Sequence, residues 1–399
     1  KGREVSTTMA FVRILNGLVK DKKIGKRVVP IIPDEARTFG MEGMFRQLGI
    51  YPSEGQKYEP VDKGQIMFYR EDQKGQILEE GITEAGAMSA WIAAATSYSN
   101  NNTTLLPFYI YYSMFGFQRI GDLAWAAGDM QARGFLCGGT AGRTTLNGEG
   151  LQHQDGHSLL QAAMIPNCRT YDPTYGHEVA VIVQDGLKRM FSDKENCFYY
   201  LTLMNENYEH PELEEIPAED IIKGMYLLRE TKGKKGHVQL LGSGTILREV
   251  EAAAEILAEE WGVGSDIWSV TSFNELRREA LGLDRQAFIN PDADPEKPHV
   301  TKCLEGRKGP AIASTDYMKL YADQVRAWVP TDYHVLGTDG YGRSDTREAL
   351  RRFFEVDRYY VTVAALKALA DRDEIDRKVV AEALKKYDID PNKPNPLEV

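Results

Sequence analysis

The chain has 399 residues, of which 42% are hydrophobic and 27% are charged, so it can bury the cores of two or three domains. Its formal net charge of −11 argues against a nucleic-acid-binding surface, which needs a concentrated basic patch to neutralise phosphates. No segment reaches the length of about 18 uninterrupted apolar residues that a membrane span requires, and the opening residues contain no signal-peptide core. We therefore expect a globular cytoplasmic protein without a nucleic-acid or membrane partner.

The cysteines and the first residue carry two further expectations. Cys137, Cys168, Cys197 and Cys303 are far apart and form no CxxC or Cys/His cluster, so a disulfide framework or a zinc site is not expected. The sequence starts at Lys1 rather than Met and enters a helical pattern almost at once. We expect it to be a piece of a longer chain.

The first half of the chain alternates helical and strand patterns. Ser6 is placed as an N-cap before apolar residues at helical spacing, and residues 27–32 then form a buried strand pattern. A helix is expected after the loop GITEAG, and residues 105–115 are an aromatic, strand-prone run. Residues 180–191 add a helix and residues 198–208 a strand. This alternation favours a doubly wound α/β sheet.

The second half repeats the same pattern after a break. Residues 210–220 have prolines and carboxylates but little apolar content, which indicates a linker. A strand, a glycine turn and an amphipathic helix follow over residues 237–262. Residues 281–310 are interpreted as a long surface loop. We therefore predict two doubly wound α/β domains, residues 1–213 and residues 214–399.

Two glycine-rich segments are similar to phosphate-binding loops, but each lacks a residue that such a loop requires. The GSG at 242–244 lacks the third glycine of a dinucleotide fingerprint, and GTDGYGRSD at 337–345 has no Walker lysine. We interpret both as turns.

The segment GGTAGRTTLNGEGLQHQDGHS, residues 138–158, is dense in Gly, Thr, Asn, His and carboxylates. His153 and His157 have the i, i+4 spacing of helical metal ligands, but Gly150 and Gly156 disfavour a regular helix, so no metal site is predicted. With few residues able to build a core, the segment either faces a ligand or is a solvated connection.

Glu84 and the aromatic run each allow two interpretations. Glu84 stands where a glycine loop gives way to an apolar helix, so it either interacts with the helix dipole or shares a proton with a heterocycle. The aromatic residues either fill the core or offer a platform for a flat cofactor ring. They are Phe108, Tyr109, Tyr111, Tyr112 and Phe115.

Taken together, several segments resemble the homodimeric bacterial pyruvate dehydrogenases, which are transketolase-like enzymes that use thiamine diphosphate. The matching segments, in the family's order, are IIPDEARTFGMEGMF, GQILEEGITEAGAM, PFYIYYSMFGFQRIGDLAWAAGDMQARGF, GGTAGRTTLNGEGLQHQDGHS and VLGTDGYGRSD. The resemblance covers essentially the whole chain. It implies the family's second domain, which binds the aminopyrimidine of the cofactor, followed by its C-terminal domain.

The family's first domain, which holds the diphosphate through Mg²⁺ with a GDG…Asn motif, has no counterpart here. The nearest string, Gly337-Thr338-Asp339-Gly340, departs from that motif. The resemblance therefore implies that the metal ligands lie outside this chain.

The resemblance also assigns roles to individual residues. Glu84 matches the glutamate that hydrogen-bonds N1′ of the aminopyrimidine and so promotes its imino tautomer. Tyr112 and Phe115 match a polar partner and the stacking residue of that ring, and the backbone at Ile82 belongs to the same surface. Glu149 and His153 match polar residues facing the substrate, and His153 is expected to handle protons during acetyl transfer. Asp34 and Glu35 match an acidic pair in the same site.

The function implied is oxidative decarboxylation of pyruvate by a homodimer, with reductive acetylation of a lipoyl group on the dihydrolipoamide acetyltransferase partner. Another 2-oxo acid dehydrogenase or transketolase-like activity stays open, because the named residues do not measure substrate length. So does a non-catalytic role in dimerisation and assembly for the chain by itself.

Overall fold

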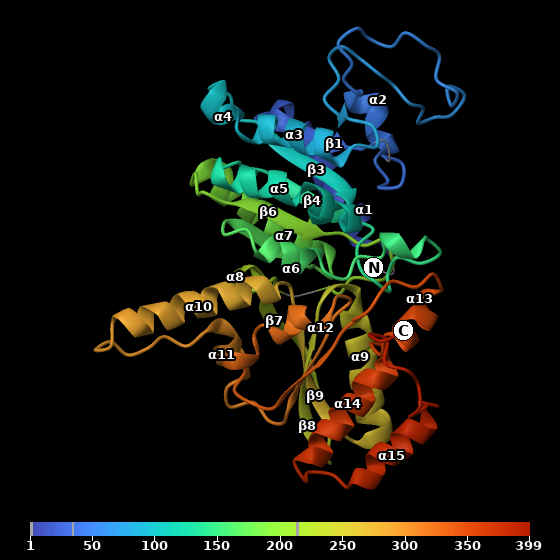
Figure 1. Cartoon of the computed structure of the whole chain (residues 1–399), viewed down its shortest axis with the longest axis vertical. Coiled ribbons are helices and arrows are strands. Elements are labelled where there is room, and N and C mark those ends of the chain that lie inside the picture. Colours follow the sequence, from blue (N-terminus) through green and yellow to red (C-terminus); the bar gives the residue numbers. More distant parts are fainter. Residues whose placement is uncertain (1–2, 34–35, 213–214) are drawn as a thin grey trace. The chain divides into compact units, whose positions relative to one another are not determined.

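The computed structural model describes residues 3–33, 36–212 and 215–399 (Figure 1). These residues form two compact units. The first comprises residues up to 141, 158–170 and 175–212, and the second comprises 142–157, 171–174 and the remainder of the chain. The predicted boundary between 213 and 214 falls on residues outside the described part and stays a prediction.

The first unit is built on a six-stranded sheet with the order β2-β1-β3-β4-β6-β5. The pairings of β1 with β2 and β3, of β3 with β4 and of β4 with β6 are all parallel. The strands are β1 (Val28–Ile32), β2 (Leu78–Glu79), β3 (Leu106–Tyr112), β4 (Phe135–Gly139), β5 (Cys168–Tyr171) and β6 (Phe198–Thr202). Because parallel strands end at the same edge, the segments that follow β1 to β4 gather at one edge of the sheet.

Helices cover both faces of this sheet, which explains why β3 is apolar and aromatic throughout rather than alternating. Phe108 contacts Phe11 of α1, with ring centroids 5.9 Å apart. The next residue, Tyr109, points to the other face, where its hydroxyl donates to the backbone carbonyl of Glu84 in α3 at 3.4 Å. The helices of the first unit are α1 (Thr7–Lys20), α2 (Phe45–Leu48), α3 (Glu84–Ala95), α4 (Ser97–Asn100), α5 (Gly116–Asp129), α6 (Ser158–Ala163) and α7 (Gly176–Leu187).

The predicted start of the first helix is confirmed. The Ser6 side chain accepts a hydrogen bond from the backbone N–H of Met9, which caps α1. Phe11, Val12 and Leu15 of α1 are buried, as their helical spacing predicts.

The second unit contains a five-stranded sheet with the order β11-β10-β8-β9-β7. Among the described strands of this sheet, β7 at the edge pairs antiparallel with β9, and the other pairings are parallel. The strands are β7 (Met225–Thr231), β8 (His237–Gly242), β9 (Gly264–Val270), β10 (Ala311–Ser314) and β11 (Tyr333–Leu336). Together with the first sheet, this confirms the predicted class of two doubly wound α/β domains.

The long surface loop predicted over 281–310 is wrong. Helix α10 (Phe273–Ile289) continues through its first third, and α11 (His299–Leu304) lies near its end. In the outer half of α10 the side chains of Leu281, Phe288 and Ile289 are 43%, 84% and 47% exposed. Because this half buries no apolar stripe, its sequence lacks the periodic pattern from which a helix is predicted. The linker predicted over 210–220 likewise runs into α8, which starts at Ala218.

The remaining helices of the second unit are α8 (Ala218–Lys223), α9 (Leu247–Ile256), α12 (Lys319–Asp323), α13 (Arg347–Phe353), α14 (Arg358–Asp371) and α15 (Arg377–Lys386). Across the described ranges, none of the helices has the length and apolar character that crossing a bilayer requires.

Candidate functional site

Glu84 lies at the edge of the first sheet where the parallel strands end. Strand β2 ends at Glu79, a short glycine loop follows, and α3 begins at Glu84. Thr83 caps the helix by accepting a hydrogen bond from the backbone N–H of Gly86 at 3.3 Å. The Glu84 side chain is 15% exposed, at the positive end of the helix dipole. The fold therefore presents this carboxylate at the edge where ligands bind in open α/β sheets.

Arg119, on α5, connects Glu84 to the aromatic residues. Its Nη1 donates to Glu84 Oε1 at 2.7 Å, and its guanidinium carbon lies 4.2 Å from the centroid of the Phe115 ring. No described residue donates a hydrogen bond to the other carboxylate oxygen, Oε2. The sequence reasoning missed Arg119, although its i, i+4 spacing from Phe115 was a usable signal. One guanidinium thus holds the carboxylate beside an aromatic ring.

Tyr112, which ends β3, belongs to the same cluster. Its ring centroid is 6.1 Å from that of Phe115 and 5.4 Å from that of Phe39. Ile82 lies in the loop just before α3, with a side chain that is 74% exposed. The structure therefore brings Glu84, Tyr112 and Phe115 to one edge of the first unit.

Tyr109 lies beneath this cluster as a hydrogen-bond donor. Burial raises the pKa of its hydroxyl, and the negative charge of Glu84 raises it further. The protonated hydroxyl can therefore keep its bond to the Glu84 carbonyl, which supports the first turn of α3.

Ser113 and Thr140 are additional polar residues at the same edge that sequence reasoning missed. Each follows directly after a strand, Ser113 after β3 and Thr140 after β4. Both hydroxyls are buried, and neither has a hydrogen-bond partner among the described residues. Thr140 also adopts a φ of +48°, which is unusual for a β-branched residue and typical of functional loops. Their position directly after a parallel strand was the signal in the sequence that could have identified both residues.

Asp34 and Glu35, the predicted acidic pair, lie outside the described residues. The strand before them, β1, ends at Ile32.

Glu149 and His153 lie in the second unit. They belong to residues 142–157, called here the His153 loop, which group with the second unit although they stand between elements of the first. The Glu149 side chain is exposed, and His153 is half-buried at the end of a short 3₁₀ turn, Leu151–His153. The regular helix that would give His153 and His157 a ligand-like spacing does not form.

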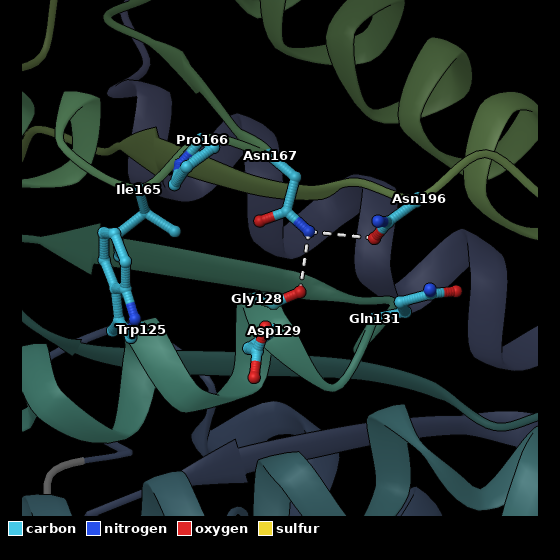
Figure 2. A pocket seen from close by; sticks show the side chains of 8 residues that line it. All are labelled: Trp125, Gly128, Asp129, Gln131, Ile165, Pro166, Asn167 and Asn196. Atoms are coloured by element: carbon cyan, nitrogen blue, oxygen red, sulfur yellow. Dashed lines mark hydrogen bonds between the residues drawn. The ribbon is translucent and has the colours of Figure 1, made fainter.

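A pocket of about 320 Å³ lies at the opposite edge of the first sheet, before the starts of β4, β5 and β6 (Figure 2). Trp125, Ile165 and Pro166 form its apolar wall. Asn167 closes its floor by donating from Nδ2 to the Gly128 carbonyl and to Asn196 Oδ1, both at 2.8 Å. None of the predicted site residues lines this pocket.

The cluster around Glu84 fits the aminopyrimidine half of thiamine diphosphate. Oε2 of Glu84 is available for a ring nitrogen, and the Phe115 ring is the flat surface beside it. Because Arg119 covers one face of that ring, a stacked heterocycle must use the opposite face or displace the guanidinium. No residue of this cluster is suited to a diphosphate, apart from Arg119, which is already paired with Glu84.

Comparison with known protein families gives two matches. Residues 1–211 match the model of the pyruvate dehydrogenase E1 component middle domain. Residues 224–357 match that of the transketolase-like C-terminal domain.

Curated relatives match over nearly the entire chain. The chain is 68% identical over 398 residues to the pyruvate dehydrogenase E1 component of Pseudomonas aeruginosa (strain PAO1), and 61% identical over 398 residues to that of Escherichia coli (strain K12). Each match covers 99% of this chain but 45% of the relative. The chain thus spans less than half the length of these relatives.

Solved structures show the same fold at low identity. Transketolase from Leishmania mexicana aligns with a TM-score of 0.67 and 16% identity, covering 93% of this chain and 46% of that one. A split-gene transketolase described as an inactive β4 tetramer aligns with a TM-score of 0.60 and 15% identity, covering 92% of this chain and 98% of that one.

Proposed function

Because this chain belongs to the pyruvate dehydrogenase E1 family, whose middle-domain model matches more than half of it, we propose that it forms the cofactor-activating part of an enzyme that oxidatively decarboxylates pyruvate. The acetyl group passes to a lipoyl group of the dihydrolipoamide acetyltransferase partner, whose disulfide is the electron acceptor. The enzyme works as a cytoplasmic homodimer within a pyruvate dehydrogenase complex.

The observation that carries this proposal is the cluster of Glu84, Arg119 and Phe115 at the carboxyl edge of the first sheet. In this cluster the Glu84 carboxylate has one oxygen available, and the Phe115 ring contacts the same Arg119 guanidinium that binds the other oxygen. A heterocycle that must be both stacked and hydrogen-bonded at a ring nitrogen is recognised by this pair of features.

Thiamine diphosphate, when bound, supplies a carbon nucleophile and accepts the electron pair left by loss of carbon dioxide. The chain's own residues prepare this chemistry. Glu84 holds a proton between its Oε2 and the pyrimidine N1′, while Arg119 fixes the other oxygen and so the direction of the carboxyl group. Phe115 orients the ring by stacking, Tyr112 offers a polar contact, and the backbone at Ile82 completes the surface.

Glu149 and His153 act on the substrate side of the reaction, together with Asp34 and Glu35. Their task is to position the 2-oxo acid and to supply or remove protons at its oxygen, with His153 serving the acetyl-transfer step. The residues that hold the diphosphate and Mg²⁺ belong to a part of the full-length protein that is not among these 399 residues. The relatives' greater length leaves room for such residues.

Steady-state assays of the full-length protein with its lipoyl-bearing partner test the substrate. We expect kcat/KM for pyruvate to exceed that for 2-oxoglutarate by about 100-fold or more, since a site that serves pyruvate offers no partner to a second carboxylate, which would be buried unpaired. Equal use of the two acids contradicts the proposal and favours another 2-oxo acid dehydrogenase, whereas transfer between sugar phosphates favours a transketolase-like activity.

The second candidate is a role in dimerisation and assembly for the 399 residues by themselves. It is favoured by the fact that the chain matches 45% of its relatives' length. Sedimentation of this chain without the rest of the protein tests this second candidate. An assembly module forms a stable oligomer in the absence of cofactor, so a monomer would contradict it.

A further inference from the structure

The His153 loop is attached to the second unit at both of its ends, whereas its middle is exposed. Residues 142–146 and 154–156 are buried, and residues 147–152 between them are exposed. Glu149 lies in the exposed part, and His153 stands at its end. Loops with this build, an exposed tip on an immobile base, hold functional side chains in a fixed geometry.

The first attachment is made by Asp316, which follows β10 by two residues and is fully buried. Its Oδ1 accepts from the backbone N–H and the hydroxyl of Thr144, at 2.8 and 2.7 Å. Its Oδ2 accepts from the backbone N–H and the hydroxyl of Thr145, at 3.1 and 2.6 Å. Four donors on two consecutive residues therefore meet one carboxylate, which fixes the backbone at the base of the loop.

Gly142 makes this close approach possible. Its φ is +88°, and a Cβ at this position would collide with Oδ2 of Asp316. Any other residue would therefore be strained in its backbone and would displace the carboxylate from Thr145.

Three arginines reinforce the same base. Arg143, which is 5% exposed, donates to the carbonyls of Thr338, at 2.9 Å, and Gly340. Nε of Arg347 donates to the carbonyl of Thr145 at 2.6 Å. Arg351 donates to the Thr144 hydroxyl at 3.3 Å.

The far end of the loop is attached through Gln154, which is fully buried. Its amide donates to the carbonyl of Leu146 at 2.9 Å and accepts from the backbone N–H of Arg343 at 2.7 Å. The Ser344 hydroxyl donates to the carbonyl of Glu149 at 2.7 Å. The exposed part of the loop is thus bridged at its two ends by the bond between Gln154 and Leu146, and its middle is bound by Ser344 at Glu149.

We infer that Asp316 is a positioning residue for the reaction: through Thr144 and Thr145 it holds the His153 loop in the geometry in which Glu149 and His153 meet the substrate. The inference rests on the proposed function, because that function assigns Glu149 and His153 to the substrate. It gives the second unit, to which Glu149 and His153 belong, the part of positioning these two proposed substrate residues.

The test compares Asp316→Asn with Asp266→Asn in the full-length, cofactor-loaded protein. The asparagine at 316 keeps the side-chain volume but turns one acceptor into a donor facing Thr144 or Thr145. Asp266 is a matched control, since it is 5% exposed, lies on β9 of the same unit, and accepts from His237, Gln239 and Arg307, none of which belongs to the His153 loop. Both variants lose a buried carboxylate, but only one loses the attachment of the loop.

Hydrogen exchange of residues 147–153 and kinetics of lipoyl acetylation are measured on both variants. We expect Asp316→Asn to speed exchange in this segment by about tenfold or more, and to lower kcat by about 10- to 100-fold with KM for pyruvate nearly unchanged. Asp266→Asn should change neither. If Asp316 had only a structural role, both variants would have a similarly lowered melting temperature, and kcat per folded molecule would be unchanged.

Exchange that rises no more in Asp316→Asn than in Asp266→Asn overturns the inference, and so does faster exchange with kcat unchanged. If Asp316→Asn does not fold, Thr145→Val, which removes one donor at constant volume, is measured against the same two outcomes. Should the wild-type protein turn over no pyruvate, the proposed function fails, while the exchange comparison still decides whether Asp316 holds the loop.

Discussion

At the scale of single residues, the ion pair between Arg119 and Glu84 fixes the orientation of the carboxylate while using only one of its two oxygens. The Arg119 side chain is 50% exposed, so the pair adds at most about 1 kcal/mol to stability. Its value is directional. Oε1 is fixed by the guanidinium, and Oε2 is left for a ligand.

Replacing Glu84 tests the centre of the cluster. We expect Glu84→Gln in the full-length enzyme to lose activity by about 100-fold or more, because an amide cannot share a proton with N1′. The fold should stay intact, since the amide keeps the shape of the side chain. Asp122→Asn, which removes an exposed carboxylate on α5, is the control. Near-normal turnover of Glu84→Gln would refute the assigned role.

Replacing Arg119 tests its part in aiming Glu84. We expect Arg119→Met to lower kcat by about tenfold, a loss in the range caused by misplacing a catalytic group, with little change in the free energy of unfolding. Arg133→Met is a matched control, because the Arg133 guanidinium also lies over a ring, 4.1 Å from the centroid of Tyr98. Equal activity losses in both variants would argue against a specific role for Arg119.

At the scale of elements, the His153 loop depends on glycines for two different reasons. Gly142 and Gly148 both have positive φ, +88° and +70°, but a Cβ at Gly148 meets nothing within 4 Å. The two positions therefore separate backbone strain from collision with Asp316.

We expect Gly148→Ala to lower the free energy of unfolding by about 1 kcal/mol, the cost of the left-handed conformation alone. Gly142→Ala should cost about 2 kcal/mol more, because the methyl group also displaces the Asp316 carboxylate. Urea denaturation of both variants measures the difference. Equal losses would show that the contact with Asp316 does not constrain this position.

Helices α9 and α14 are joined by Glu249, which accepts from the backbone N–H and the guanidinium of Arg358 at 2.9 to 3.0 Å. Burial raises the pKa of this carboxyl, but Arg358 and Arg351 outweigh it, so the pKa in the folded protein lies below the ordinary value of 4.5. The ionised form therefore stabilises the fold above pH 4.5, and this contribution is lost as the pH falls through the lowered pKa.

We expect the free energy of unfolding to fall less between pH 7 and pH 3 in Glu249→Gln than in the wild type. Equilibrium denaturation at several pH values measures this slope. The exposed Glu259, on the helical turn after α9, is the control, and Glu259→Gln should keep the wild-type slope. A wild-type slope in Glu249→Gln would contradict the assignment.

At the scale of the whole molecule, the residues proposed to contact the cofactor reach only its aminopyrimidine. We therefore expect the 399-residue chain alone to bind thiamine diphosphate about 100-fold more weakly than the full-length protein, because the contacts to diphosphate and Mg²⁺ are missing. Calorimetry with and without Mg²⁺ measures the two affinities, with a cooperative melting transition as the control for folding. Tight, magnesium-dependent binding by this chain alone would contradict the prediction.

The sequence by itself determined the fold class, several strands and the start of α1, because these follow from local patterns: alternating elements, apolar runs and a helix cap. The site roles of Glu84, Tyr112 and Phe115 came only from the resemblance to the family and stay predictions. It failed for α10, whose outer half is exposed and has no buried stripe. Tertiary structure alone decided the setting of Glu84 beside Arg119, 35 residues away, and the attachment of the His153 loop to Asp316, more than 170 residues away. Contacts over such separations depend on which strand ends meet in space, and no local pattern encodes that.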